Sequence, residues 1–265
     1  MRQHRVTPPD STAGLWFVET SDDRAVLKLI HAGATKGSRW PASLDPASPY
    51  WWRREPVAYE SGVLEPYGAP ACRAVVERGD GLVALWLDAA PEPPDWTPGL
   101  LGEVARRLGR AQAAALPEAP WLVHGFLREY LRLHDVRDGE DVLARLDAQP
   151  PTLCHNDLHP ANVLGLHGEV VIDWPYCGLG AAGLDAGVLV ADGIADGAFP
   201  AEQADEVATA VWDGYLDGLG GAFDDAEVRF AFARGTALRL SWLPRCERPE
   251  WDAAIAFLER LASDA

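Results

Sequence analysis

Two neighbouring segments carry polar side chains whose types and spacing suit chemistry. Residues 153–164 read Leu-Cys-His-Asn-Asp-Leu-His-Pro-Ala-Asn-Val-Leu, which sets the carboxylate of Asp157 five positions before the amide of Asn162. Residues 170–174 read Val-Val-Ile-Asp-Trp, so a second carboxylate, Asp173, ends an apolar strand. We expect these three side chains to converge at one site.

The three side chains are those that transfer of a phosphoryl group requires. One carboxylate orients the attacking hydroxyl and accepts its proton, while an amide and a second carboxylate bind Mg²⁺ on the phosphates of ATP. We therefore predict Asp157 as the catalytic residue, Asn162 and Asp173 as metal ligands, and ATP and Mg²⁺ as cofactors. A His-x-Asp-x-x-x-x-Asn match alone could arise by accident, but its combination with Ile-Asp-Trp nearby is specific.

Residues 154–164 resemble the catalytic loop of aminoglycoside phosphotransferases and choline kinases, and residues 171–174 resemble the strand end that holds their metal. In this family an Asp after a Gly-rich turn supports the catalytic loop, and Asp185 takes that place in Gly-Ala-Ala-Gly-Leu-Asp-Ala-Gly. We expect His155 to organise the same loop through hydrogen bonds from its ring to the backbone, because Asp157 already fills the role of the base.

The resemblance extends toward the N-terminus through less specific motifs. Lys28, in Ala-Val-Leu-Lys-Leu, resembles the strand lysine that meets the α and β phosphates of ATP. Residues 52–55 resemble the start of the helix that supplies its glutamate partner. We assign Glu55 as this partner, with Glu60 as the competitor, because Pro56 directly after Glu55 should disturb a helix.

The segment Leu-Trp-Leu-Asp at residues 85–88 resembles the hinge whose backbone groups receive adenine. This resemblance assigns Leu85 and Leu87 to nucleotide binding. Only Gly14 precedes Lys28 where a phosphate-covering loop would lie, so the Gly-x-Gly-x-x-Gly of protein kinases is absent. The thin loop keeps open a function of another class, a nucleotide-binding pseudokinase scaffold without turnover.

The elements around these residues predict a two-lobed, protein-kinase-like α+β fold, in which a small antiparallel sheet faces a larger, mainly helical lobe. Residues 14–30 read as a β-hairpin, and residues 82–87 read as an apolar strand that stops at Asp88 before several prolines. Between them, residues 51–64 are expected to form a helix that Pro56 restricts or kinks.

The predicted division of the chain follows the change from strands to helices. We place a nucleotide-binding lobe at residues 1–88, a hinge or linker at 89–98, and a catalytic and acceptor-binding lobe at 99–265, with ATP between the lobes. Apolar periodicity in the last lobe predicts helices at residues 100–116, 121–133, 201–219, 225–240 and 251–261.

Composition and charge exclude several classes of protein. The 265 residues carry a formal net charge of −17, which repels a phosphate backbone, so we expect no nucleic acid partner. No apolar stretch approaches the roughly 20 residues that cross a bilayer, and the first residues lack the apolar run of a signal peptide. We therefore expect no membrane association and a cytoplasmic location. The four cysteines lack C-x-x-C spacing and are interpreted as buried thiols.

The acceptor is predicted to be a small, positively charged molecule, such as an aminoglycoside-like antibiotic or a related natural product. Asn156, where many aminoglycoside enzymes have Gly and choline kinases commonly have Asn, keeps a choline or ethanolamine acceptor open. A hydroxyl on a peptide or a natural-product intermediate is the other alternative, and the sequence does not set the oligomeric state. The acidity that supports a cationic acceptor follows the metal-binding strand, at Asp185, Asp192, Asp196, Asp213, Asp217, Asp224 and Asp225.

Overall fold

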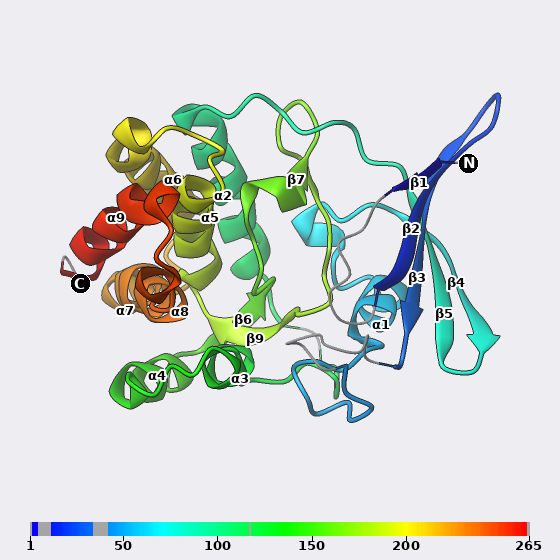
Figure 1. Ribbon diagram of the computed structural model, residues 1–265, viewed down its shortest axis with the longest axis horizontal. Helices are drawn as coiled ribbons and strands as arrows, with labels where there is room; N and C mark the ends of the chain where they lie inside the picture. The colour runs from blue at the N-terminus through cyan, green and yellow to red at the C-terminus, as the bar shows by residue number, and fades with distance from the viewer. Residues whose placement is uncertain (1, 5–11, 34–41, 117, 264–265) are drawn as a thin grey trace.

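A five-stranded antiparallel sheet lies on one side of the molecule and a group of helices on the other (Figure 1). The computed structural model describes residues 2–4, 12–33, 42–116 and 118–263. This arrangement confirms the predicted α+β fold with a small antiparallel sheet. The strands follow the order β1 (Arg2–His4), β2 (Thr12–Glu19), β3 (Arg24–His31), β5 (Leu82–Asp88) and β4 (Cys72–Gly79).

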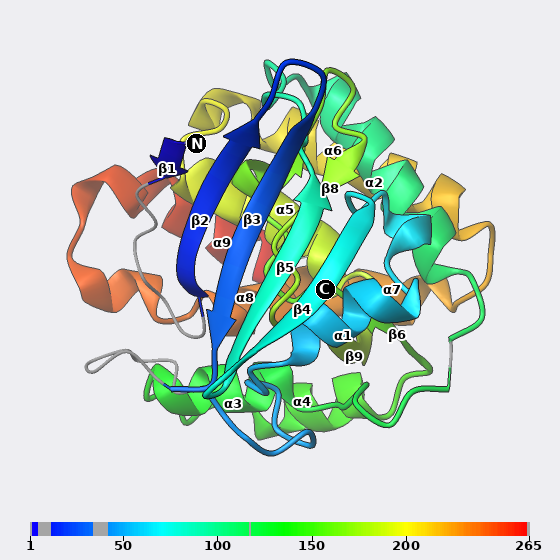
Figure 2. The same ribbon diagram turned by 90° about the vertical axis from the view of Figure 1, so that its right-hand side faces the viewer.

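The hairpin of β2 and β3 confirms the strands predicted at residues 14–30. Its register pairs Leu15 with Lys28, and β5 pairs Leu85 with Lys28 on the other side. Directly opposed side chains share one face of a sheet, so Lys28 points to the same face as the two leucines. Helix α1 (Arg54–Ser61) covers this face, and the other face is turned outward, toward the viewer in Figure 2.

Helix α1 begins at Arg54, which places Pro56 in its first turn. The expected kink was wrong, because a proline in the first turn removes no intrahelical hydrogen bond. The buried guanidinium of Arg54 fixes the start of the helix by donating to the backbone oxygens of Ser48 (2.6 Å) and Cys177 (3.3 Å). The helix is therefore tied to the catalytic segment as well as to the sheet.

Residues 89–97 connect the sheet to the helical part without forming a helix or a strand. Helix α2 (Pro98–Gln112) then begins after Thr97, whose side chain accepts a hydrogen bond from the backbone N–H of Leu100 (3.2 Å). A threonine cap followed by proline is a strong start signal for a helix. The assignment of this segment as a hinge between two lobes stays a prediction.

The other predicted helices are present, with their ends shifted by a few residues or more. Strands β1, β4 and β9 and two helices were not predicted. One of these helices, α5, is buried on nearly every side, so it lacks the amphipathic period of a surface helix. The helices of this part are α3 (Phe126–Leu133), α4 (Glu140–Asp147), α5 (Leu184–Ala195), α6 (Ala204–Leu219), α7 (Asp225–Phe230), α8 (Thr236–Arg239) and α9 (Asp252–Ser263).

A π-helical turn, Ala231–Gly235, separates α7 from α8, where the sequence predicts one helix. Here the chain packs against α5 at Gly187, at which a Cβ atom would lie 2.1 Å from Oγ1 of Thr236 and 2.2 Å from the backbone oxygen of Phe232. Only glycine permits this approach. Because a π turn inserts extra backbone into a helix, it changes the direction of the residues that follow, including Arg239.

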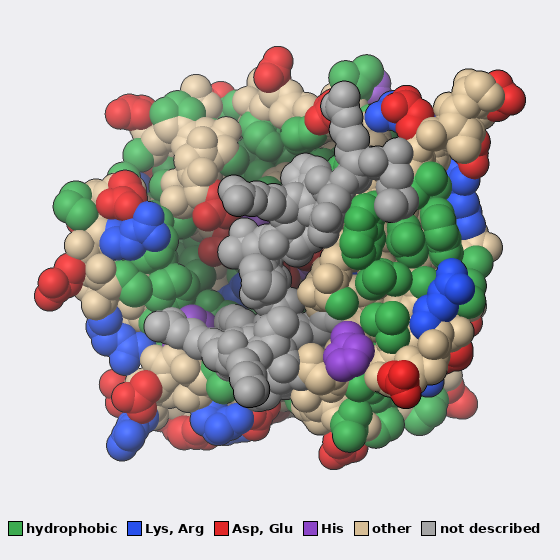
Figure 3. Space-filling model, turned by 45° about the vertical axis from the view of Figure 1, so that its right-hand side comes forward, with side chains coloured by type: hydrophobic (Ala, Val, Ile, Leu, Met, Phe, Trp, Pro, Cys, Tyr) green, Lys and Arg blue, Asp and Glu red, His purple; other side chains and the backbone are tan. Residues whose placement is uncertain are grey.

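Hydrophobic side chains form one core among α2, α5, α6 and α9, and a second core between the sheet, α1 and the segment that contains Trp174. On the face shown in Figure 3, hydrophobic atoms also gather over the sheet and over the helical part. Cys154 and Cys177 are buried, but Cys72 is half-buried and Cys246 is exposed, so the prediction of buried thiols was wrong for the last. No helix in the described ranges is both long and apolar enough to cross a membrane.

Candidate active site

The predicted catalytic residue, Asp157, lies in the loop between two short strands, β6 (Pro151–Cys154) and β7 (Val163–Leu164). Its side chain is 34% exposed, so a hydroxyl group can reach the carboxylate. Strand β6 pairs with β9 (Gly178–Ala181), and β7 pairs with β8 (Val170–Val171). These two small sheets hold the loop at both of its ends.

Asp185, at the start of α5, holds the catalytic loop through hydrogen bonds to the loop backbone. Its two carboxylate oxygens accept hydrogen bonds from the backbone N–H groups of His155 (2.7 Å) and Asn156 (2.9 Å). The side-chain amide of Gln112 donates a third hydrogen bond, of 3.2 Å, to Asp185. Burial raises the pKa of Asp185 above its ordinary value, although these donors oppose the shift. Asp185 therefore contacts the loop in the way that the sequence resemblance implied.

The ring of His155 is buried and joins the catalytic loop to the strand that precedes Asp173. Its Nε2 lies 2.9 Å from the backbone oxygen of Ile172, and its Nδ1 accepts a 3.2 Å hydrogen bond from the backbone N–H of Asp157. Burial lowers the pKa of His155, which favours the neutral ring. The proton then belongs on Nε2, where it is donated to Ile172, and both ring nitrogens bind backbone as predicted.

The two predicted metal ligands flank the paired strands β7 and β8, with Asn162 directly before β7 and Asp173 two positions after β8. Asn162 donates from Nδ2 to the backbone oxygen of Asp157 (2.9 Å), which leaves its amide oxygen for a cation. The backbone N–H of Ile172 donates to the backbone oxygen of Asn162 (2.9 Å), and this bond brings the two segments together. Asp173 adopts a left-handed backbone conformation, with φ of 65°, and 45% of its side chain is exposed.

This donor set fits Mg²⁺. No three His, Cys, Asp or Glu side chains gather as a metal site within the part of the chain that the structure describes. Magnesium in nucleotide enzymes is held by one or two protein oxygen ligands together with phosphates and water, so a carboxylate and an amide oxygen are sufficient. Asp173 and Asn162 are thus chemically suited to a phosphate-bound Mg²⁺.

Lys28 lies between two carboxylates and is itself buried. Its Nζ is 2.7 Å from Oε2 of Glu55 and 2.5 Å from Oδ1 of Asp173. Burial alone would lower the pKa of Lys28, but the two carboxylates outweigh it and raise the pKa above its ordinary value. Glu55 also accepts a hydrogen bond from the backbone N–H of Trp174 (3.3 Å), whereas Glu60 is exposed. The partner of Lys28 is therefore Glu55.

The predicted adenine contacts need a correction. Leu85 and Leu87 are buried within β5, which pairs with β3 on one side and with β4 on the other. The ladders of a central strand use its backbone N–H and C=O groups, so these two residues cannot offer them to adenine. Backbone outside the sheet begins at Ala89, directly after the strand.

A cavity of about 310 Å³ opens beside Asp157 and combines carboxylates with aromatic rings. His159 is partly buried, and its Nδ1 lies 3.2 Å from Oδ2 of Asp196. The lining residues are Thr12, Phe126, Tyr130, Asp157, His159, Asp173, Pro175, Tyr176, Asp192, Asp196, Arg239, Leu240 and Trp242.

Arg239 is a residue of this cavity that the sequence analysis missed. Its Nη2 donates to Oδ1 of Asp157 (2.8 Å) and lies 3.8 Å from Oδ2 of Asp192, and only 4% of its side chain is exposed. Burial raises the pKa of Asp192 to about 6, although Arg239 opposes this shift. No short motif surrounds Arg239, and the predicted helix at residues 225–240 also carries Arg229 and Arg234, so no signal in the sequence singled it out.

The other acidic residues of the C-terminal region lie away from the cavity. Asp217 is exposed and pairs with Arg106 (2.6 Å), and Asp224 accepts hydrogen bonds from the first backbone N–H groups of α7. Asp213 and Asp225 are also exposed. Of the acidic residues that follow the metal-binding strand in the sequence, Asp192 and Asp196 are therefore the ones that line the cavity.

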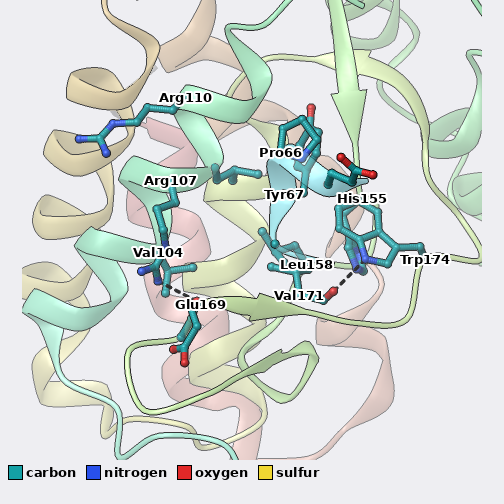
Figure 4. A pocket seen from close by; sticks show the side chains of 14 residues that line it. Pro66, Tyr67, Val104, Arg107, Arg110, His155, Leu158, Glu169, Val171 and Trp174 are labelled. Carbon is teal, nitrogen blue, oxygen red and sulfur yellow. Dashed lines mark hydrogen bonds between the residues drawn. The ribbon is translucent and has the colours of Figure 1, made fainter. Parts of the chain in front are cut away.

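A second cavity, of about 250 Å³, lies behind the catalytic loop, between the turn Glu65–Tyr67, α2 and the β7–β8 hairpin (Figure 4). His155 and Trp174 line it, and Trp174 Nε1 donates to the backbone oxygen of Val171 (3.0 Å). Arg107 donates to the backbone oxygen of Gly168 (2.7 Å), which occupies its guanidinium. These contacts hold the hairpin against α2.

Comparisons with known proteins agree with this arrangement. The family model described as "Phosphotransferase enzyme family" matches residues 7–230. A search of curated protein sequences returned no match.

Among solved structures, the amicoumacin kinase hAmiN, in complex with AMP-PNP, Ca²⁺ and Ami, is 15% identical, with a TM-score of 0.60 over 99% of this chain and 88% of that chain. A spectinomycin phosphotransferase in complex with ADP and spectinomycin is 13% identical, with a TM-score of 0.53 over 98% and 88%. A choline/ethanolamine kinase family protein from Mesorhizobium loti is 19% identical, with a TM-score of 0.51 over 97% and 88%. At these identities the structures establish a shared kinase-like fold.

The family model spans most of the chain and includes the catalytic loop, the metal-binding strand and α5. Its match and the kinase-like neighbours are consistent with the buried lysine and the grouped carboxylates described above. The chain belongs to the phosphotransferase enzyme family and is an ATP-dependent phosphotransferase that acts on hydroxyl groups.

Proposed function

We propose that this enzyme moves the γ-phosphate of ATP to a hydroxyl of a small cationic molecule, with Asp157 as the base. The observation that carries the proposal is the position of Asp157, whose half-exposed carboxylate borders a cavity rich in acidic and aromatic side chains. Asp157 is also separated from the buried Lys28–Glu55 pair by Asp173 and Asn162, which suits an acceptor on one side and phosphates on the other.

In this mechanism Lys28 binds the phosphates of ATP, and Glu55 keeps its ammonium group in place. Asn162 and Asp173 would hold Mg²⁺, which supplies neutralisation of phosphate charge when bound. Asp157 accepts the proton of the acceptor hydroxyl while the oxygen attacks the γ-phosphorus in line with the leaving oxygen of ADP. His155 and Asp185 position the loop and take no proton from the acceptor.

The cationic acceptor is supported by the balance of charge around the cavity. Among the described residues that line it, four are carboxylates, those of Asp157, Asp173, Asp192 and Asp196, and one is an arginine, Arg239. The rings of Phe126, Tyr130, Tyr176 and Trp242 add faces that attract cations and bury the apolar parts of a ring system. Amino sugars and quaternary amines with a free hydroxyl combine these properties.

Choline-like acceptors stay the first alternative, although Asn156 does not favour them through direct contact. Its side chain is buried and donates from Nδ2 to the backbone oxygen of Tyr176 (2.9 Å). Asn156 therefore supports the wall of the cavity through Tyr176. A hydroxyl on a peptide or natural-product intermediate is the second alternative.

The proposal is tested by thermal unfolding with Mg-ATP together with ATP consumption over a panel of acceptors. The panel contains spectinomycin, amicoumacin and choline as cations, with glycerol as a neutral control and glycerate as an anionic control. We expect Mg-ATP to stabilise the fold and at least one cation to accelerate consumption. Binding of Mg-ATP without consumption on any acceptor would support the scaffold function instead.

Salt dependence then tests the charge argument. The screening length falls from about 10 Å at 0.1 M salt to about 3 Å at 1 M, so attraction of a cation to the cavity weakens. We expect the KM of the acceptor to rise with salt more steeply than the KM of ATP. If a neutral or anionic molecule is an active acceptor and its KM does not change with salt, the prediction of a cationic acceptor is wrong. The proposal of phosphotransfer would still stand.

A further inference from the structure

Arg239 makes an unusual set of contacts for a buried arginine. Within the described chain, the only hydrogen bond of its guanidinium is the one that Nη2 donates to Oδ1 of Asp157 (2.8 Å). Nε and Nη1 are buried and have no hydrogen-bond partner there. A buried donor without a partner costs about 1–3 kcal/mol, so a purely structural arginine would be expected to satisfy more of its donors.

Several elements hold the guanidinium at this point. The ring of Tyr130, on α3, lies 5.2 Å from its central carbon, and Asp192, on α5, lies 3.8 Å from Nη2. Asp185 also lies close enough to Arg239 to act on its charge, and His159 lies close to Asp157 and Asp192. The π-helical turn Ala231–Gly235 precedes α8 and brings its last residue to the catalytic loop.

We propose that Arg239 is a positioning residue for Asp157, which fixes Oδ1 so that Oδ2 faces the acceptor hydroxyl. The inference rests on the proposed role of Asp157 as the base. During transfer the acceptor oxygen forms a bond to the γ-phosphorus, and the bond from that phosphorus to the bridging oxygen of ADP breaks. The hydroxyl proton passes to Oδ2 of Asp157 and then to solvent. Arg239 itself gives up no proton.

The competing explanation is that Arg239 only neutralises the buried carboxylate of Asp192. The two distances favour positioning, because the hydrogen bond goes to Asp157 and the contact with Asp192 is a longer ion pair. A double variant separates the explanations. Arg239→Met alone leaves Asp192 buried and charged, whereas Arg239→Met with Asp192→Asn removes both charges at once.

The experiment measures ADP formation from Mg-ATP, with water as acceptor and with the best cation of the panel, together with thermal unfolding. Misplacement of a reacting group by about 1 Å costs on the order of 100-fold, so Arg239→Met should lower kcat by about 10- to 100-fold with little change in the KM of ATP. The double variant should recover thermal stability but not kcat. Arg239→Lys should retain an intermediate kcat, because an ammonium cannot reproduce the planar guanidinium.

Chemical rescue gives an independent readout. Guanidinium chloride at low millimolar concentration should restore part of the activity of Arg239→Ala, and sodium chloride at equal ionic strength should not. A double variant with full kcat would overturn the positioning role. Wild-type protein without turnover, or an active Asp157→Asn, would instead contradict the proposed function on which this inference rests.

Discussion

Two buried cations, Lys28 and Arg239, each lie near two carboxylates but contact them in different ways. Lys28 lies between Glu55 and Asp173 at 2.7 and 2.5 Å, so both of its carboxylate partners are close. Arg239 lies between Asp157 and Asp192 at 2.8 and 3.8 Å, so one partner is close and the other is distant. The first cation is enclosed by its partners, and the second is directed at a single carboxylate.

The difference follows from what each side has to bind. A lysine between two carboxylates stays charged and fixed, which suits the phosphates of the proposed nucleotide. Arg239 instead donates its hydrogen bond to Asp157, the proposed base. We infer that Lys28 is placed to keep its charge for binding phosphates, whereas Arg239 is placed to orient the carboxylate of Asp157.

The largest expected effect is the loss of kcat when Asp157, the proposed base, is replaced. Asp157→Asn should lower kcat by about 100-fold or more, because the lost carboxylate serves the hydroxyl and general-base contributions have this size. Mg-ATP affinity and thermal unfolding should stay close to wild type. The kinetics of ADP formation, calorimetry and thermal unfolding measure these quantities, and a variant that keeps more than about a tenth of the wild-type rate would refute the assignment.

The next effect concerns Asp173, the proposed metal ligand that Lys28 contacts. Asp173→Ala should weaken Mg-dependent nucleotide binding by roughly 10- to 100-fold, since even outer partners of metal sites contribute this much. Calorimetry with ATP in the presence and absence of Mg²⁺ measures the change. Asp196→Ala, at the acceptor cavity, is the matched control and should leave Mg-ATP affinity unaltered. Equal affinities for Asp173→Ala and wild type would place the metal elsewhere.

A smaller effect tests the enclosed ion pair. Glu55→Gln should lower kcat/KM by about tenfold, because a hydrogen bond to a buried charged group contributes roughly 1.5–3 kcal/mol. Glu60→Gln, on the same helix but exposed, should behave like wild type. Steady-state kinetics with varied ATP compare the two. Equal rates for both variants would mean that this pair has no part in transfer.

The smallest effect concerns Asp192, the distant partner of Arg239. Its pKa is raised to about 6, so the folded protein binds its proton more tightly than the unfolded chain does. This contribution to stability is complete below about pH 4 and is lost as pH rises through 6. Asp192→Asn should therefore gain on the order of 2 kcal/mol relative to wild type between pH 4 and 7.

Urea unfolding across this range measures that slope for both proteins. Asp213→Asn, which removes an exposed carboxylate on α6, is the matched control and should follow the wild-type slope. If Asp192→Asn loses stability at pH 7, Arg239 needs its distant partner as much as Lys28 needs its own partners. The contrast between the two cations would then disappear.

Much of the fold and of the nucleotide side could be predicted because the signals are local. Apolar runs on either side of a polar turn predicted the β2–β3 hairpin, a continuous apolar run predicted β5, and helical periodicity predicted α2, α6 and α9. Helix α5 escaped detection since it is apolar on nearly every side, and the proline in α1 gave a misleading break signal. A periodic pattern of apolar residues reveals the buried face of a helix or strand only where its opposite face is exposed to solvent.

The sequence by itself determined the residue types and spacing of Asp157, Asn162 and Asp173, because a loop and an adjoining strand end bring them together over a short stretch of chain. Only the tertiary structure decided which carboxylate pairs with Lys28, that β5 closes its backbone to adenine, and that Arg239 meets Asp157 across 82 positions. Such contacts depend on how helices and strands pack. No local pattern of side chains encodes them, since packing joins residues whose separation along the chain is arbitrary.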